Sequence, residues 1–408
     1  MGARVLVAEI GAALMLILAA LAAGLAPRHA PPAMDALIEP GGRAADVALA
    51  VNDPDEYAWR LFLYLNRQAA PGAAGVADPG RSILAYQPDA PVVWETWPLV
   101  SGDGKTQAGS EVLPPNGAAP VAWPALSRAA WPAKRLSVRL SNPEGPAMLE
   151  VRINRASYDF IRARGLYNVA GLQRLYAEAQ AAGDPDAVRF PIGAKAVKAV
   201  WRDLGANPPA ALLARYHWRR IGGRVFGLTG LHIATRDLPT WFWADFEHVD
   251  DPLPPGEPSQ DLTTRGPSAA ARGRVDGERR ELIGSKWAYY RLRGAQIGFV
   301  DARGAPTRLS DAMLEQGFEH TSCITCHARA TIRFEHGRLT ALGPNPANFD
   351  DADARPPALA DAANTDLGAP RPGQFGKRGL DFLQTDFVWS LAVRAPREVP
   401  GGRLVPRP

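Results

Sequence analysis

Apolar side chains recur at helical spacing in two parts of the chain. Between residues 53 and 66 they fall near one face of a helix, and Asp53-Pro54 is typical of a first helical turn. Residues 154–179 repeat this spacing with a break at Gly165. We expect one buried helix from the first segment and one or two helices from the second.

Other segments show the alternation or the apolar runs that are typical of β-strands. Residues 136–140 and 193–201 alternate, although neither face of the second segment is cleanly apolar. Residues 224–234 form an apolar run, residues 241–249 are rich in aromatic side chains, and strand character returns at 286–300. Helices and strands together predict an α+β fold with a large mixed helix and strand body.

Both cysteines of the chain lie in one motif, Cys323-Ile324-Thr325-Cys326-His327. In a c-type haem site each thiol forms a thioether with one vinyl group, and the histidine that follows ligates the iron. Two cysteines placed at random would give this arrangement on the order of once in ten thousand. We therefore predict one covalent haem c, attached to Cys323 and Cys326, with His327 as the proximal iron ligand.

Two other kinds of site also use two cysteines at this spacing. A zinc site needs two further ligands, and the chain has no second cysteine pair. A thioredoxin-like redox pair is expected after a strand of a βαβ unit, whereas residues 309–317 predict a short helix before the motif. The redox dithiol remains the main competing interpretation.

The N-terminus predicts export, which covalent haem attachment requires. Arg4 precedes an uncharged run at 10–26 that is short for a membrane span and typical of a signal-peptide core. Ala20 and Ala22 offer a cleavage site, and an uncleaved anchor in the inner membrane is the alternative. In either case we expect the body of the protein in the periplasm.

Composition divides the remainder of the chain. Residues 250–281 and 338–378 are rich in Pro, Gly and polar residues and predict a linker and an irregular segment. Residues 382–392 regain apolar character and predict a strand or helix that docks on the haem region. The expected divisions are a leader at 1–30, the mixed body at 31–265 and the haem-binding region at 266–408.

Charge gives little support to nucleic acid as a partner. The chain has 46 basic and 42 acidic residues spread along its length, for a net charge of +4. A redox partner protein is the partner that the haem motif implies.

The second axial position of the iron decides the chemistry. No methionine follows His327, so the usual downstream ligand of small cytochromes c is missing. The first candidate is His232, which stands among apolar residues on a predicted strand, and the second is His248, beside Glu247. Candidates with less support are Met313, His320 and His336. An open or water-bound position is the remaining alternative.

Beyond the haem motif, the chain resembles exported bacterial cytochrome-c-like proteins of unassigned function. The resemblance covers most of the chain after the leader. The segments that carry it are residues 57–66, Val93-Trp94-Glu95-Thr96, Gly230-Leu231-His232-Ile233, Trp241-Phe242-Trp243, Phe246-Glu247-His248-Val249-Asp250 and residues 322–327. It implies a mono-haem c protein and names no substrate.

Three functions are consistent with these patterns. Single-electron transfer through the haem is the leading hypothesis. The alternative is a haem-dependent peroxidase or oxidoreductase, in which His232 or His248 and the aromatic residues at 241–246 line an open distal site. A haem-based sensor for a small gas, or a binding module of that kind, is the third.

Overall fold

A computed structural model describes most of the chain after residue 37. The residues described are 38–85, 87, 90–101, 110–123, 138–142, 145–184, 187–251, 282–299, 307, 309, 323–328, 330–340 and 383–395. The predicted signal-peptide core at 10–26 and the predicted helix at 309–317, apart from Leu309, lie outside them. Within the described part, no helix has the length and apolar character needed to cross a membrane.

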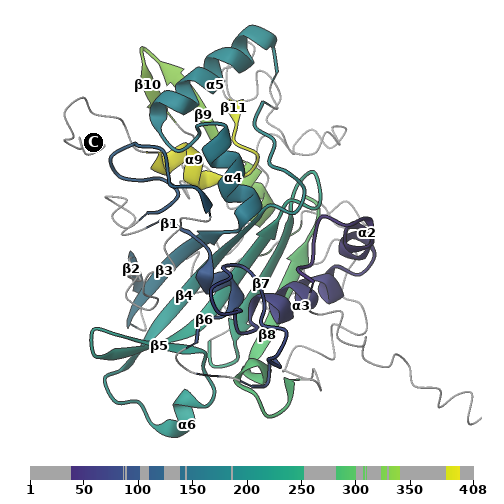
Figure 1. The fold of residues 1–408 in the computed structure, drawn as a ribbon, viewed down its shortest axis with the longest axis vertical. Coiled ribbons are helices and arrows are strands. Elements are labelled where there is room, and N and C mark those ends of the chain that lie inside the picture. The colour runs from purple at the N-terminus through teal and green to yellow at the C-terminus, as the bar shows by residue number, and fades with distance from the viewer. Residues whose placement is uncertain are drawn as a thin grey trace, which may run out of the picture. The chain divides into compact units, whose positions relative to one another are not determined.

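Antiparallel strands form the centre of the fold. The main sheet has eight strands in the order β1-β3-β4-β6-β7-β8, and β2 pairs with β3 while β5 pairs with β6 (Figure 1). The strands are β1 (Leu99–Ser101), β2 (Val138–Asn142), β3 (Gly145–Ile153), β4 (Lys195–Gly205), β5 (Trp218–Ile221), β6 (Arg224–Thr235), β7 (Phe242–His248) and β8 (Tyr290–Gln296). Helices and antiparallel sheets together confirm the predicted α+β class.

The strand β8 joins the two regions that composition separates. The predicted boundary between residues 265 and 266 falls outside the described residues. Strand β8 belongs to the region after this boundary, and it pairs antiparallel with β7 of the body. Trp243 lies opposite Gln296, and His248 lies opposite Tyr290. The predicted body and the predicted haem-binding region therefore share one sheet.

A second, smaller sheet includes segments that follow the motif at 323–327 in the chain. Its strands are β9 (Thr331–Glu335), β10 (Arg338–Thr340) and β11 (Leu383–Gln384), in the order β10-β9-β11. The prediction that residues 338–378 are irregular is wrong at 338–340. There the tight turn at His336-Gly337, with both residues at positive φ, returns the chain to pair with β9.

The helices follow the predicted pattern. Asp53 accepts a hydrogen bond from Glu56 N at 3.1 Å and begins α3, and Gly165, at φ 68°, separates α4 from α5. The short aromatic run after Val92 forms a 3₁₀ helix, η2. The helices are α2 (Ala44–Asn52), α3 (Pro54–Leu65), η2 (Val93–Thr96), α4 (Arg155–Ala163), α5 (Val169–Ala182), α6 (Ala210–Leu213), η5 (Lys286–Tyr289), α8 (Cys323–Ala328) and α9 (Trp389–Arg394).

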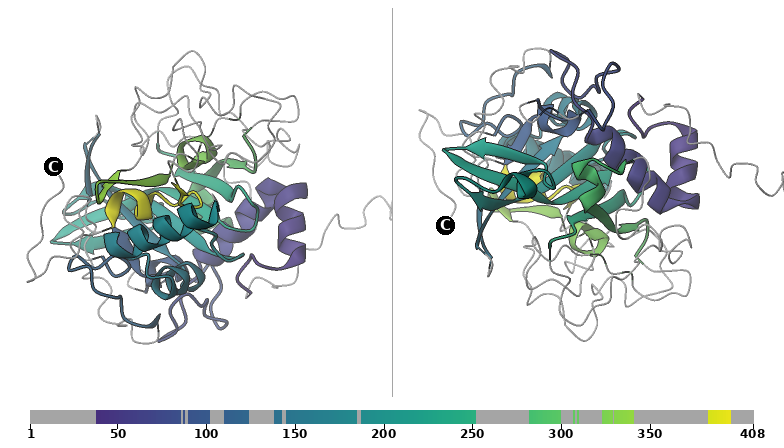
Figure 2. Two further views of the ribbon diagram at one scale, coloured as in Figure 1. Left: turned by 90° about the horizontal axis from the view of Figure 1, so that it is seen from above. Right: turned by 90° about the horizontal axis from the view of Figure 1, so that it is seen from below.

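The main sheet is covered on both faces by separate hydrophobic cores. On β4, Val197 and Trp201 belong to a first core with α3, and Ala196 packs against a second core with α4, α5, α8 and α9. Figure 2 shows α9 and the small sheet beside α5. Both faces of the predicted strand at 193–201 are therefore covered, although neither face is cleanly apolar in the sequence. Lys195, for example, is buried and paired with Glu39.

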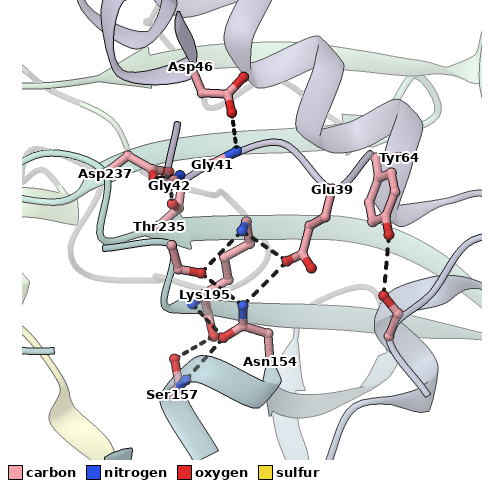
Figure 3. Close-up of polar contacts among 12 residues, drawn as sticks. Glu39, Gly41, Gly42, Asp46, Tyr64, Asn154, Ser157, Lys195, Thr235 and Asp237 are labelled. Atoms are coloured by element: carbon pink, nitrogen blue, oxygen red, sulfur yellow. Dashed lines mark hydrogen bonds and ion pairs between the residues drawn. The ribbon is translucent and has the colours of Figure 1, made fainter. Parts of the chain in front are cut away.

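A buried polar cluster fixes the start of the described body to the sheet (Figure 3). Lys195 is 2% exposed, and its Nζ lies 2.9 Å from Glu39 Oε1. Asp237 accepts hydrogen bonds from Gly42 N at 2.7 Å and from the Tyr57 hydroxyl at 2.6 Å. These two hydrogen bonds give the buried Asp237 carboxylate the partners that it needs, and the Gly42 amide ties the start of the described body to the sheet.

Gly41 is needed for this close approach. Its φ is 113°, and a Cβ at this position would lie 2.9 Å from Lys195 Nζ and 3.0 Å from Asp237 Oδ2. A side chain there would be strained and would displace both charged groups.

We expect Tyr57→Phe to lower the free energy of unfolding by about 1–2 kcal/mol, because it removes a hydrogen-bond donor to a buried carboxylate. Urea unfolding measures the change. Tyr64→Phe on the same helix is the matched control, since its hydroxyl lies 3.4 Å from Gly75 O, at the limit of a hydrogen bond. Equal losses in the two variants would contradict this account of the cluster.

Candidate functional site

The Cys-Ile-Thr-Cys-His motif forms α8, on the face of the sheet that carries the second core. At its start, Cys323 N donates to Leu309 O at 3.1 Å and Ile324 N donates to the side-chain oxygen of Gln296 at 3.0 Å. At its end, Gln384 Nε2 donates to Ala328 O at 3.1 Å. Strands β8 and β11 thus satisfy backbone groups that a short helix leaves unpaired at its ends.

His327 is held by one hydrogen bond that also selects its tautomer. Its Nδ1 lies 2.7 Å from Phe387 O, and because a carbonyl only accepts, Nδ1 carries the proton. The other ring nitrogen, Nε2, is then the one with a lone pair. Burial lowers the pKa of His327 to about 3, so the imidazole is neutral at physiological pH. The Trp243 ring lies beside it, with 4.4 Å between the ring centroids.

The carbonyl that binds His327 belongs to a strained turn between β11 and α9. Asp386 and Phe387 have φ values of 47° and 66°, which residues other than glycine rarely adopt. The Asp386 carboxylate stabilises the turn by accepting from Phe190 N at 2.7 Å and from Arg236 Nε at 3.1 Å. This confirms that the apolar segment at 382–392 docks on the motif.

Three polar residues face α8 from adjacent strands of the sheet. Lys198 on β4 lies opposite His232 on β6, and His232 lies opposite Asp245 on β7. The His232 ring contacts its neighbours through both nitrogens: Nδ1 lies 3.0 Å from Asp245 Oδ1, and Nε2 lies 2.9 Å from Cys323 Sγ. Cys323, His232 and Asp245 therefore form a linear chain of hydrogen-bonding groups.

Asp245 is a site residue that the sequence patterns did not single out. It is fully buried on β7, between Ala244 and Phe246, both also fully buried. A carboxylate in a strand that is buried throughout requires a partner, and this requirement was the signal available in the sequence. Identifying the partner as His232 required the pairing of β6 with β7.

His248, the second candidate ligand, lies on the opposite face of β7 from Asp245. Its Nδ1 accepts from Asp250 N at 3.1 Å, and its Nε2 donates to Arg215 O at 3.2 Å. The ring stacks on Tyr216 with 3.7 Å between centroids. The structure does not bring His248 to the motif, because β7 alternates its side chains between the two cores.

The remaining candidates are placed away from α8 or fall outside the described residues. His336 is exposed in the turn between β9 and β10. His320 and Met313 lie outside the described residues. Of the axial ligands predicted for the second position, His232 alone contacts the motif in the part of the chain that the structure describes.

Within the described residues, no group of three or more His, Cys, Asp and Glu side chains converges to hold a metal ion. A haem iron does not need such a group, because the porphyrin supplies its equatorial ligands and the protein supplies axial ones. The neutral His327 ring, with Nε2 as its acceptor nitrogen, and two thiols on the same helix fit that donor set.

No known protein family, curated protein or solved structure matches this chain. The resemblance to exported cytochrome-c-like proteins therefore remains an expectation from the sequence.

Acid should destabilise the fold partly through His248. Burial lowers its pKa to about 4, whereas an unfolded histidine titrates near 6.5. Below about pH 6.5 the unfolded chain therefore takes up the proton first, and stability that is present at neutral pH is lost as the pH falls toward 4, by up to about 3 kcal/mol.

Replacing His248 by Gln keeps an acceptor and a donor at this position and removes the titration. We expect the free energy of unfolding of His248→Gln to fall less steeply between about pH 7 and pH 4 than that of the wild type. Urea unfolding across this range measures both slopes. The exposed His336→Gln is the control, and an unchanged slope for His248→Gln would contradict the assignment.

Proposed function

We propose that this chain is an exported mono-haem c protein that transfers single electrons. The observation that supports this most directly is the hydrogen bond from His327 Nδ1 to Phe387 O. It leaves a neutral imidazole with Nε2 as the ligating nitrogen, on the same short helix as both cysteines. Histidines that bind metals commonly have their other ring nitrogen fixed by a backbone carbonyl in this way.

In this proposal Cys323 and Cys326 hold the haem through thioethers, and His327 is the proximal ligand of its iron. The haem supplies a one-electron couple when bound. The protein supplies orientation, through Gln296 at the start of α8 and Phe387 beside His327, and an apolar surrounding from the second core. Apolar surroundings and the hydrogen bond on the ligand are among the properties that tune the reduction potential.

Export belongs to the same proposal. Residues 10–26 act as a signal-peptide core, or as an inner-membrane anchor if they are not cleaved, and place the body in the periplasm. The redox partner is then a protein of that compartment.

A second candidate is a haem-dependent oxidoreductase. The observation that favours it is the pair of His232 and Asp245, which can move a proton within contact of Cys323. In the structure, His232 Nε2 contacts the sulfur that would bond to the rim of the porphyrin. This contact favours a role for His232 at the haem edge over one as axial ligand.

Protein purified from the periplasm should retain its haem after acid-acetone extraction, because thioethers survive this treatment and axial ligation does not. We expect the Cys323→Ser/Cys326→Ser variant to lose the haem completely and His327→Ala to keep it with an altered iron spectrum. Absorption of the extracted protein measures both. Wild-type protein that retains no haem would contradict all three hypotheses: electron transfer, the haem-dependent oxidoreductase and the gas sensor.

Exogenous ligands separate electron transfer from the other hypotheses. A ferric and ferrous spectrum that cyanide and carbon monoxide leave unchanged is the result expected for electron transfer, because both axial positions are then filled. Ligand binding accompanied by peroxide turnover would favour the oxidoreductase. Ligand binding without turnover would favour the gas sensor.

A further inference from the structure

The two thiols of the motif have different surroundings. Cys323 is 1% exposed, and its sulfur lies 2.9 Å from His232 Nε2 and 3.3 Å from Leu309 O. Cys326 is half-buried, one turn further along α8. The contact with His232 gives the Cys323 thiol a basic group at hydrogen-bond distance.

The hydrogen bonds place the acceptor nitrogen of His232 on the thiol. A carboxylate only accepts, so Nδ1 carries the proton and donates a hydrogen bond to Asp245 Oδ1. In the neutral ring Nε2 is then an acceptor. The single proton of the Cys323 thiol has two acceptors within reach, Nε2 at 2.9 Å and Leu309 O at 3.3 Å, and the nitrogen is the nearer one. Cys323, His232 and Asp245 are thus placed as a nucleophile, a base and a group that orients the base. This arrangement, at these distances, activates thiols.

Three adjacent strands hold the pair in place. His232 is 5% exposed in the C-terminal half of β6, which lies between β4 and β7, and its register partner Asp245 is fully buried. The ring cannot turn away without breaking its bond to the carboxylate in a site from which water is excluded. The base is therefore preorganised toward one sulfur.

We propose that His232, oriented by Asp245, is the base that activates Cys323 for covalent attachment of haem. This inference rests on the proposed function, because it concerns how the same cofactor becomes bound.

His232 Nε2 takes the proton of the Cys323 thiol while the sulfur bonds to a vinyl carbon, and the imidazolium returns the proton to the neighbouring vinyl carbon. The S–H bond and the vinyl π bond break, and an S–C and a C–H bond form. The addition needs no oxidant or reductant. The thiolate is the reactive form of a cysteine, and His232 generates it where it is used.

Single-cysteine backgrounds test the inference. The full chain is purified without haem under reducing, anaerobic conditions, either as Cys326→Ser, which keeps Cys323, or as Cys323→Ser, which keeps Cys326. Ferrous haem is added, and the covalent adduct is followed by the mass of the denatured protein. Adding His232→Gln should slow adduct formation by about 10²-fold in the Cys326→Ser background and leave it unchanged in the Cys323→Ser background.

Further controls separate catalysis from folding. Asp245→Asn should also slow attachment at Cys323, because an amide no longer holds the ring in the required tautomer. The exposed His336→Gln should have no effect. In urea, where the strands are no longer paired, wild-type and His232→Gln chains should react at the same slow rate. Circular dichroism and thermal unfolding show which variants remain folded.

Equal rates for the folded Cys326→Ser chain with and without His232→Gln would overturn the inference. So would haem attachment in cells together with no adduct in the purified single-cysteine chain, because attachment would then not depend on the chain's own base. Wild-type protein that carries no covalent haem even after export would instead overturn the proposed function. The two failures are therefore distinguishable.

Discussion

The antiparallel pairing of β4, β6 and β7, buried on both faces, is the constraint on which the rest of this structure depends. A strand covered on both faces has no solvent to satisfy its polar side chains, so each must find a partner across the sheet or in the elements above it. On one face Val197 and Leu231 are apolar core residues and need no such partner. On the other face, His232 and Asp245 meet this condition by binding one another.

The same constraint shapes the first core, where charged groups are also buried. Glu95 is fully buried between Arg219, with which it makes a close ion pair, and His217, whose Nε2 lies 3.0 Å from it. Burial alone would raise the pKa of Glu95, but the charge of Arg219 and the contact with His217 outweigh it and lower the pKa to about 2. Removing one partner of such a pair costs more than the pair contributes, so these residues are structurally interdependent.

The candidate site combines segments that are far apart in the chain. The cysteines and His327 come from α8, their backbone is held by Gln296 of β8 and by Gln384 of β11, and the carbonyl that fixes His327 comes from Phe387. His232 reaches the same helix from β6. The Cys-x-x-Cys-His motif can be recognised from its own residues, but the Cys323 thiol contacts a strand residue that lies ninety-one positions away in the chain.

The sequence by itself determined where several elements begin or break and which residues form the Cys-x-x-Cys-His motif. The spacing of Cys323, Cys326 and His327, the helix that begins at Asp53 and the break at Gly165 are all local, because capping, helical periodicity and cysteine spacing act over a few residues. The tertiary structure alone decided that His232 contacts Cys323 and that His248 faces the other core. Strand register and alternation set which buried side chains meet, and these depend on pairings between distant segments that no local pattern encodes.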